Sequence, residues 1–137
     1  MTDEIVHEGG CLCGHVRYRI EGDPLRACHC HCSQCRRASG AAFLTWVAYP
    51  VGAFAFIRVQ PGVFKATDAA ERPFCPRCGT QLTFRHREST RQVDVTAGSL
   101  DEAGAVRPQD HIWDSSRLPW LVIDDALPRH RGERGEG

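Results

Sequence analysis

The sequence predicts a mainly β, single-domain protein with little helix. Apolar residues recur with a period of two along several short segments, which is typical of half-buried strands. Turn sequences that contain both Gly and Pro separate these segments. A third observation is the presence of eight cysteines in three groups within 137 residues. Together these features predict a compact domain of small twisted antiparallel sheets organised around metal–thiolate sites.

Individual segments support the strand prediction. In residues 15–22, Val16, Tyr18 and Ile20 alternate with charged residues, and residues 81–88 and 92–98 show the same pattern. Residues 41–50 and 54–62 are more continuously apolar, which predicts strands covered on both faces. Turns are expected at 21–24 and 60–62. Residues 33–39, directly after the cysteine-rich run, predict a short helix or turn.

Composition limits the classes of partner and compartment. Lys plus Arg and Asp plus Glu both number 17, so the formal charge is zero and no long-range field would gather nucleic acid or an anionic membrane. The opening MTDEIVHEGG has no basic or apolar run typical of a signal peptide, and no transmembrane span is expected. We therefore expect a cytoplasmic protein with reduced thiols. The predicted domain covers 5–130, and the charged, glycine-rich segment 131–137 predicts a disordered tail.

The outer two groups of cysteines make one complete set of metal ligands. Cys11 and Cys13 form a C-x-C pair, and Cys75 and Cys78 lie in a C-P-x-C-G knuckle, where Gly79 permits a tight backbone. Four thiolates are the donor set of a closed structural zinc site. Such a site would join two distant parts of the chain and remove much of the entropy of the unfolded state. The alternatives are buried cysteines acting as small apolar residues, or a redox pair at Cys75 and Cys78.

The middle group, Cys28, Cys30, Cys32 and Cys35, leaves two possibilities open. In an extended segment the first three cysteines share one face, whereas His29 and His31 share the other. Cys35, after a turn, can return to the same metal. The group therefore supplies either four thiolates, if Cys28 joins, or three thiolates and an open position, as catalytic zinc requires. His31 is expected to be solvated or to lie behind the ligands rather than among them.

Four motifs resemble those of the glutathione-dependent formaldehyde-activating enzyme family, which includes S-(hydroxymethyl)glutathione synthase-like and centromere protein V-like zinc domains. They are GGCLCGHVRY at residues 9–18, CHCSQCRRASG at 30–40, RPFCPRCGTQL at 72–82, and HIWDSSRLPW at 111–120 followed by DALP at 125–128. The motifs occur in order along nearly the whole chain.

The resemblance implies a compact, mostly β fold with two zinc ions. It implies a structural zinc on the residues matching Cys11, Cys13, Cys75 and Cys78. It also implies a second zinc on those matching Cys30, Cys32 and Cys35, where Cys28 is not part of the motif. The implied reaction joins glutathione to formaldehyde and gives S-hydroxymethylglutathione.

The sequence thus predicts a zinc-dependent carbon–sulfur lyase-type enzyme whose partners are a small thiol, glutathione, and an aldehyde. Arg36 and Arg37 are candidates for binding glutathione carboxylates, although solvated surface charge explains them equally well. Trp46, Trp113 and Trp120 are expected in the core or lining a groove, and His111 is expected to be a structural hydrogen-bonding residue. The alternatives are a non-catalytic zinc scaffold or protein-interaction module, or the same chemistry with another thiol or aldehyde.

Overall fold

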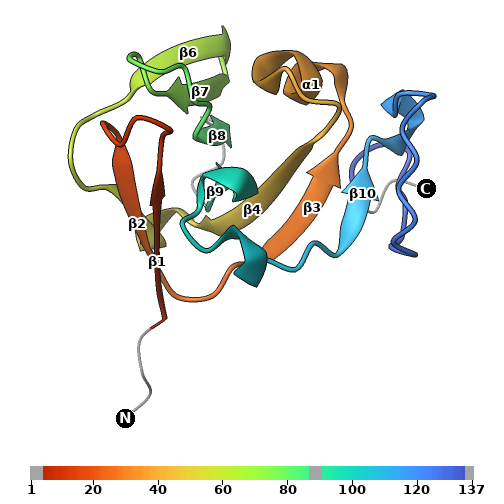
Figure 1. Cartoon of the computed structure of the whole chain (residues 1–137), viewed down its shortest axis with the longest axis horizontal. Helices are drawn as coiled ribbons and strands as arrows, with labels where there is room; N and C mark the ends of the chain where they lie inside the picture. Colours follow the sequence, from red (N-terminus) through yellow and green to blue (C-terminus); the bar gives the residue numbers. More distant parts are fainter. Residues whose placement is uncertain (1–4, 87–90, 135–137) are drawn as a thin grey trace.

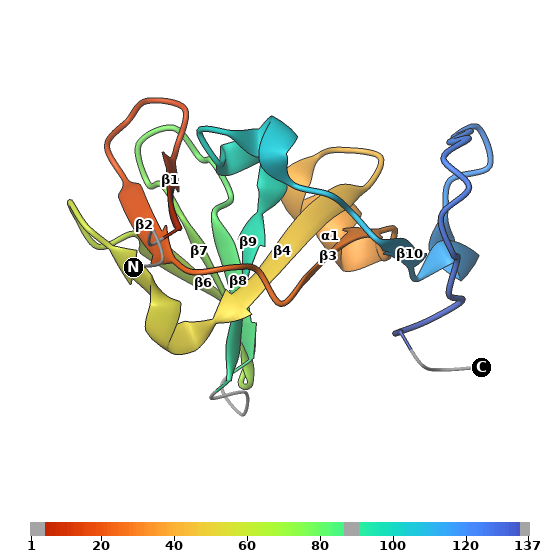
Figure 2. The ribbon, with the colours of Figure 1, turned by 90° about the horizontal axis from the view of Figure 1, so that it is seen from below.

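The computed structural model describes residues 5–86 and 91–134. Its strands form a three-stranded sheet, ordered β1-β2-β5, and a seven-stranded sheet, ordered β10-β3-β4-β9-β8-β7-β6. The small sheet and the C-terminal segment lie at opposite ends of the molecule (Figures 1 and 2). The strands are β1 (Val6–Gly10), β2 (Arg17–Glu21), β3 (Arg26–Cys30), β4 (Leu44–Pro50), β5 (Phe54–Phe56), β6 (Gly62–Thr67), β7 (Ala70–Phe74), β8 (Thr83–His86), β9 (Gln92–Thr96) and β10 (Asp110–Ile112). The mainly β prediction is confirmed.

The main core lies between the two sheets. Tyr18 and Ile20 of β2 are fully buried, while the intervening Arg19 is exposed, as the alternation predicts. β4 is buried on both faces from Trp46 to Tyr49, because Val47 and Tyr49 pack in the main core whereas Trp46 packs in a second apolar cluster with Cys28, Cys30 and Cys35. β5 differs from the expectation for 54–62: Ala55 is exposed and the strand is three residues long. It is an edge strand paired with β2 alone.

One strand pair departs from the antiparallel prediction. β10 pairs with β3 in parallel, with Asp110 opposite Cys28 and Ile112 opposite Cys30. Parallel neighbours need a long connection. Here the connection runs from the end of β3 at Cys30 to the start of β10 at Asp110 and includes α1 and the strands β4 to β9. This pairing brings the motif that begins at His111 beside the cysteine-rich strand.

Helical structure in the described residues is short, as predicted. The α-helix α1 spans Ser33–Ser39, and Gly40 ends it in the left-handed conformation. The other turns are 3-10 helices, namely η1 (Val51–Ala53), η2 (Ala97–Ser99), η3 (Ala103–Ala105) and η4 (Asp114–Ser116). Within the described residues, no helix is both long and apolar enough to cross a membrane.

The first part of the predicted tail makes side-chain contacts that differ from the disorder expected for it. Arg134 makes two hydrogen bonds to Asp110, whose side chain is 5% exposed. The indole N–H of Trp113 donates to Glu133. Residues 135–137 lie outside the described part of the chain, as do positions 87 and 88 of the strand predicted over 81–88.

Candidate metal centres and the adjoining cavity

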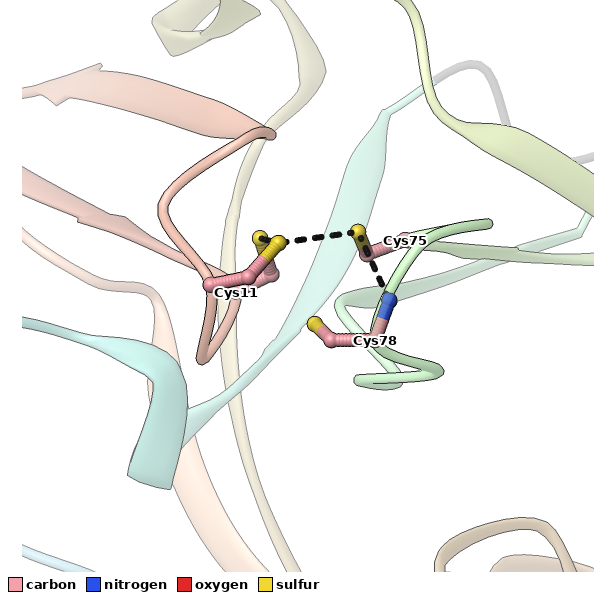
Figure 3. Close-up of side chains that lie close together, drawn as sticks. Cys11, Cys75 and Cys78 are labelled. Carbon is pink, nitrogen blue, oxygen red and sulfur yellow. Dashed lines mark hydrogen bonds between the residues drawn. The ribbon is translucent and has the colours of Figure 1, made fainter.

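The first cysteine cluster joins the β1–β2 turn to the turn that follows β7 (Figure 3). The Sγ atoms of Cys11 and Cys13 lie 3.6 Å apart, and those of Cys13 and Cys75 lie 3.8 Å apart. All four sulfurs, including that of Cys78, lie within 4.8 Å of one another. The structure therefore brings together the four cysteines that the sequence predicts as one set.

Backbone groups surround these sulfurs with hydrogen-bond donors. The N–H groups of Arg77 and Cys78 point to the Cys75 sulfur, at 3.4 and 3.5 Å, and Val16 N–H points to Cys11. Gly79 follows with φ of 81°, a left-handed conformation that a side chain would strain. A hydrogen bond from Thr80 lowers the pKa of the Cys78 thiol to about 5. These donors favour thiolates at this site.

The spacing of the four sulfurs fits zinc. A tetrahedral zinc with Zn–S bonds of about 2.3 Å places its sulfurs about 3.8 Å apart. The two sulfur–sulfur distances of 3.6 and 3.8 Å agree with that value. The cysteines of the described chain are free of disulfide bonds. The cluster could therefore hold a closed, four-thiolate zinc.

The second cluster consists of Cys30, Cys32 and Cys35, whose sulfurs also lie within 4.8 Å of one another. Cys30 ends β3, and Cys32 is the N-cap residue of α1, where its sulfur accepts the N–H of Cys35 at 3.2 Å. The indole N–H of Trp46 donates to the Cys35 sulfur at 3.3 Å. Hydrogen bonds shared among the thiols lower the pKa of Cys32 and raise that of Cys30. Three sulfurs converge here, so this cluster also fits zinc.

Cys28 does not belong to the group of mutually close sulfurs. It lies two residues before Cys30 on β3, opposite Trp46 and Asp110. Its side chain is buried, and burial raises the pKa of the thiol to about 12. Cys28 therefore packs as a neutral thiol in the core beside the cluster.

A cavity of about 490 Å³ opens over the three-cysteine cluster. This volume falls in the range of small-molecule sites, about 300–1,000 Å³. Its walls combine aromatic rings with charged groups from several strands. Besides the three cysteines, its lining includes Trp46, Phe84, Trp113, Arg26, Arg72, Asp94 and Glu133. A reactive sulfur and a substrate could thus meet in a partly apolar pocket.

The opposite face of the cysteine run carries a buried chain of hydrogen bonds. Nε2 of His31 lies 2.8 Å from Nδ1 of His111, and Nε2 of His111 lies 2.7 Å from a carboxylate oxygen of Asp125. Both imidazoles are fully buried. Burial, together with the neighbouring His111, lowers the pKa of His31 to about 4. His31 therefore lies behind the cysteines, and His111 is a buried hydrogen-bonding residue, as expected.

Other predicted site residues are more dispersed. Arg36 and Arg37 do not line the cavity over the cysteines; Arg37 lines a neighbouring groove. Trp46 and Trp113 line the cavity, whereas Trp120 is 70% exposed, so the core or groove expectation is wrong for Trp120.

Sequence reasoning missed Arg72, Phe84 and Asp94 as cavity residues. The segments of Phe84 and Asp94 show only a strand period, which identifies a face but not what the face contacts, and no strand was predicted around Arg72. The one available signal was the position of Arg72 inside the knuckle motif.

Comparisons with known proteins show the family of this chain. The family model described as "Glutathione-dependent formaldehyde-activating enzyme" matches residues 6–116, and the chain belongs to this family. An uncharacterized lyase of Schizosaccharomyces pombe is 34% identical over 100 residues, which cover 66% of each chain, just under two thirds of that relative. A putative glutathione-dependent formaldehyde-activating enzyme of Halomonas elongata is 28% identical over 129 residues, covering 85% of this chain and 80% of the relative.

A solved structure supports the fold alone. The crystal structure of a Rhodobacter sphaeroides protein matches with a TM-score of 0.58 and 22% sequence identity. The match covers 69% of this chain and 88% of that chain.

Family membership and the names of the relatives support a lyase-type enzyme.

Proposed function

We propose that this protein is a zinc-dependent enzyme that joins glutathione to formaldehyde and gives S-hydroxymethylglutathione. Cys11, Cys13, Cys75 and Cys78 would hold a structural zinc. Cys30, Cys32 and Cys35 would hold a second zinc that keeps one position for the thiol. The observation that carries the proposal is a group of three converging sulfurs in the wall of a cavity.

The reaction needs a thiolate and a carbonyl carbon held together. When bound, zinc supplies a positive charge that lowers the pKa of a coordinated thiol towards neutrality. A carbon–sulfur bond forms, the carbon–oxygen π bond opens, and the thiol proton ends on the new hydroxyl, so no oxidant or reductant is required. The chain contributes the cysteines, which Trp46 and the N–H of Cys35 orient. The aromatic walls of the cavity exclude part of the water.

Two measurements test the proposal. Cobalt-substituted protein should change its visible absorption when glutathione is added, because the coordination of one metal changes. Because glutathione and formaldehyde combine spontaneously, the rate is measured by exchange NMR with ¹³C-formaldehyde. The zinc-loaded protein should accelerate this exchange, whereas Cys32→Ala should lose both the acceleration and the spectral response.

The matched control is Cys28→Ala, which removes a nearby thiol outside the cluster and should retain both responses. A cobalt spectrum with two four-thiolate sites, unchanged by glutathione, would contradict the proposal and favour a zinc scaffold. A spectral response without acceleration would assign the electrophile to another class of aldehyde.

A further inference from the structure

Arg72 on β7 is a buried cation for which the described residues show no ion pair. The residue is 6% exposed. Its Nη1 nitrogen is buried and has no hydrogen-bond partner among the described residues. The contact found for its guanidinium is with the ring of Phe84, 4.7 Å from the centroid. A buried guanidinium that lacks a carboxylate is costly to the empty protein, so its presence calls for a ligand.

The position of Arg72 connects two hollows. It lines the cavity over Cys30, Cys32 and Cys35, and also a groove of about 690 Å³ between α1 and the β6–β7 hairpin. Gln34 on α1 lines both hollows as well. Figure 1 shows α1 and the hairpin along the same side of the molecule. A ligand whose sulfur lies at the cysteines can therefore extend past Arg72 into the groove.

The groove also contains an amide without partners. Both Nε2 and Oε1 of Gln81 are buried, and neither has a hydrogen-bond partner among the described residues. Gln81 lines the groove together with Arg37 and the apolar Phe64 and Phe74. A side-chain amide that is a donor and an acceptor matches a peptide group, which offers one of each. The polar groups left unpaired thus have the chemistry to receive a carboxylate and a peptide bond.

We infer that Arg72 and Gln81 bind the non-reacting part of the substrate, and that this substrate is an extended thiol carrying a carboxylate and a peptide group. The inference rests on the proposed function for the position of the sulfur. Glutathione fits this class, and a small neutral thiol does not. Arg72 replaces Arg36 and Arg37 as the main carboxylate-binding residue, since neither of those lines the cysteine cavity.

Binding measurements with the zinc-loaded full chain test the inference. Isothermal titration would compare three probes: glutathione, S-methylglutathione, whose sulfur cannot form a thiolate, and 2-mercaptoethanol, which has no carboxylate or peptide group. Arg72→Met should weaken binding of both glutathione compounds at least tenfold, because charge-assisted hydrogen bonds are lost. Binding of 2-mercaptoethanol should stay within twofold. Gln81→Leu should weaken the glutathione compounds by a smaller factor.

Arg85→Met is the matched control. Arg85 lies on β8 next to Phe84 and lines a different hollow, so its loss should leave all three affinities unchanged. The melting temperature provides a second measurement. Removing an unpaired buried cation should leave the empty protein equally stable or more stable, whereas a purely structural Arg72 would lower the melting temperature on substitution. If Arg72→Met does not fold, Arg72→Lys keeps the charge but loses the paired donors and should still weaken glutathione.

The outcomes separate the two claims. Equal glutathione affinity of wild type and Arg72 variants overturns the inference, while binding of 2-mercaptoethanol leaves the proposed function intact. If neither thiol changes the metal spectrum but S-methylglutathione binds in an Arg72-dependent manner, the binding role of Arg72 stands and the proposed thiol chemistry fails. Absence of binding by all three probes overturns both.

Discussion

Cys28 and Cys30 are two residues apart on one strand, yet their surroundings give them different chemistry. The Cys30 sulfur converges with two others, whereas Cys28 packs in the core next to Trp46. Because burial raises the pKa of Cys28 to about 12, ionisation of this thiol is unfavourable at neutral pH. Ligands of one metal ion must converge on it, and the Cys28 sulfur lies outside the group of mutually close sulfurs, so Cys28 is poorly placed to complete the cluster.

Substitution of single cysteines distinguishes these roles. Cys28→Ala should retain cobalt absorption of both clusters, with a loss of stability below about 2 kcal/mol for a small buried group. Cys32→Ala should abolish the absorption of the three-cysteine cluster. Visible spectra of both variants at equal cobalt loading measure the absorption of the two clusters. Loss of half the cobalt signal in Cys28→Ala would instead mean that Cys28 is a ligand.

Asp110 links acid stability to its ion pairs with Arg134 and His130. Burial acts to raise the pKa of its carboxyl, but hydrogen bonds from Arg134 and His130 outweigh burial, so the pKa in the folded protein is below its ordinary value. A lowered pKa contributes stability at pH values above about 4, and the contribution is lost as pH falls through the folded pKa.

We expect the unfolding free energy of wild type to fall more steeply between pH 5 and pH 3 than that of Asp110→Asn. At neutral pH the variant should be less stable by about 1.5–3 kcal/mol, the value of hydrogen bonds to a charged group. Urea unfolding from pH 3 to neutral pH measures the pH dependence of the unfolding free energy and the stability difference at neutral pH. Parallel pH curves would contradict the assignment. Asp101→Asn, which removes an exposed ion pair with Arg17, is the control.

At the scale of elements, the two cysteine clusters hold different amounts of structure together. The first joins the β1–β2 turn to the turn after β7, and Cys13 and Cys75 are 62 positions apart. The second connects the end of β3 to the first turn of α1, over a few residues. Closing a long loop restricts the unfolded chain more than closing a short one.

Metal-ligand substitutions should therefore have unequal effects. Cys78→Ser should lower the melting temperature by well over 10 °C or prevent expression, since a structural zinc contributes several kcal/mol to folding. Cys35→Ser should weaken the second metal and lower the melting temperature by a few degrees. Scanning calorimetry of the zinc-loaded proteins compares them. An equal collapse of both variants would assign a structural role to the second cluster too.

At the scale of the whole molecule, local patterns in the sequence predicted local structure well. The alternation around Tyr18 and Ile20 predicted β2, and the Ser33–Ser39 segment forms the short helix expected after the cysteines. The four cysteines of the first cluster could be grouped from their number and type alone. The strand and the helix depend on residues that are close in the sequence, and the grouping of the cysteines depends on the number of ligands that zinc requires.

Features set by distant contacts could not be predicted. The parallel pairing of β10 with β3 depends on how a long connection folds. The contact of Arg72 with the ring of Phe84 joins β7 to β8, and no strand was predicted for Ala70–Phe74, the segment that contains Arg72. The apolar run at 54–62 suggested two covered faces, but Ala55 of β5 is exposed and the strand ends at Phe56.

The intact protein should contain two zinc ions. Elemental analysis after purification under reducing conditions is expected to give about two equivalents per chain, because two clusters each have the donor set that zinc favours. A chelator should remove the second metal first, since that cluster supplies three protein ligands where the first supplies four. A stoichiometry near zero with all thiols titratable would exclude both sites.

The different sequence spans of the clusters also have a consequence for biosynthesis. Cys32 and Cys35 are three positions apart, so the compact cluster can capture metal as soon as that stretch is made. The four-cysteine cluster can bind metal only after Cys75 and Cys78 have been synthesised. Its formation then costs about 2 kcal/mol more in loop-closure entropy. The order of metallation would thus follow the order of synthesis. Cobalt added to the urea-unfolded chain should enter the compact cluster first, and its partner should fill only as the denaturant is diluted.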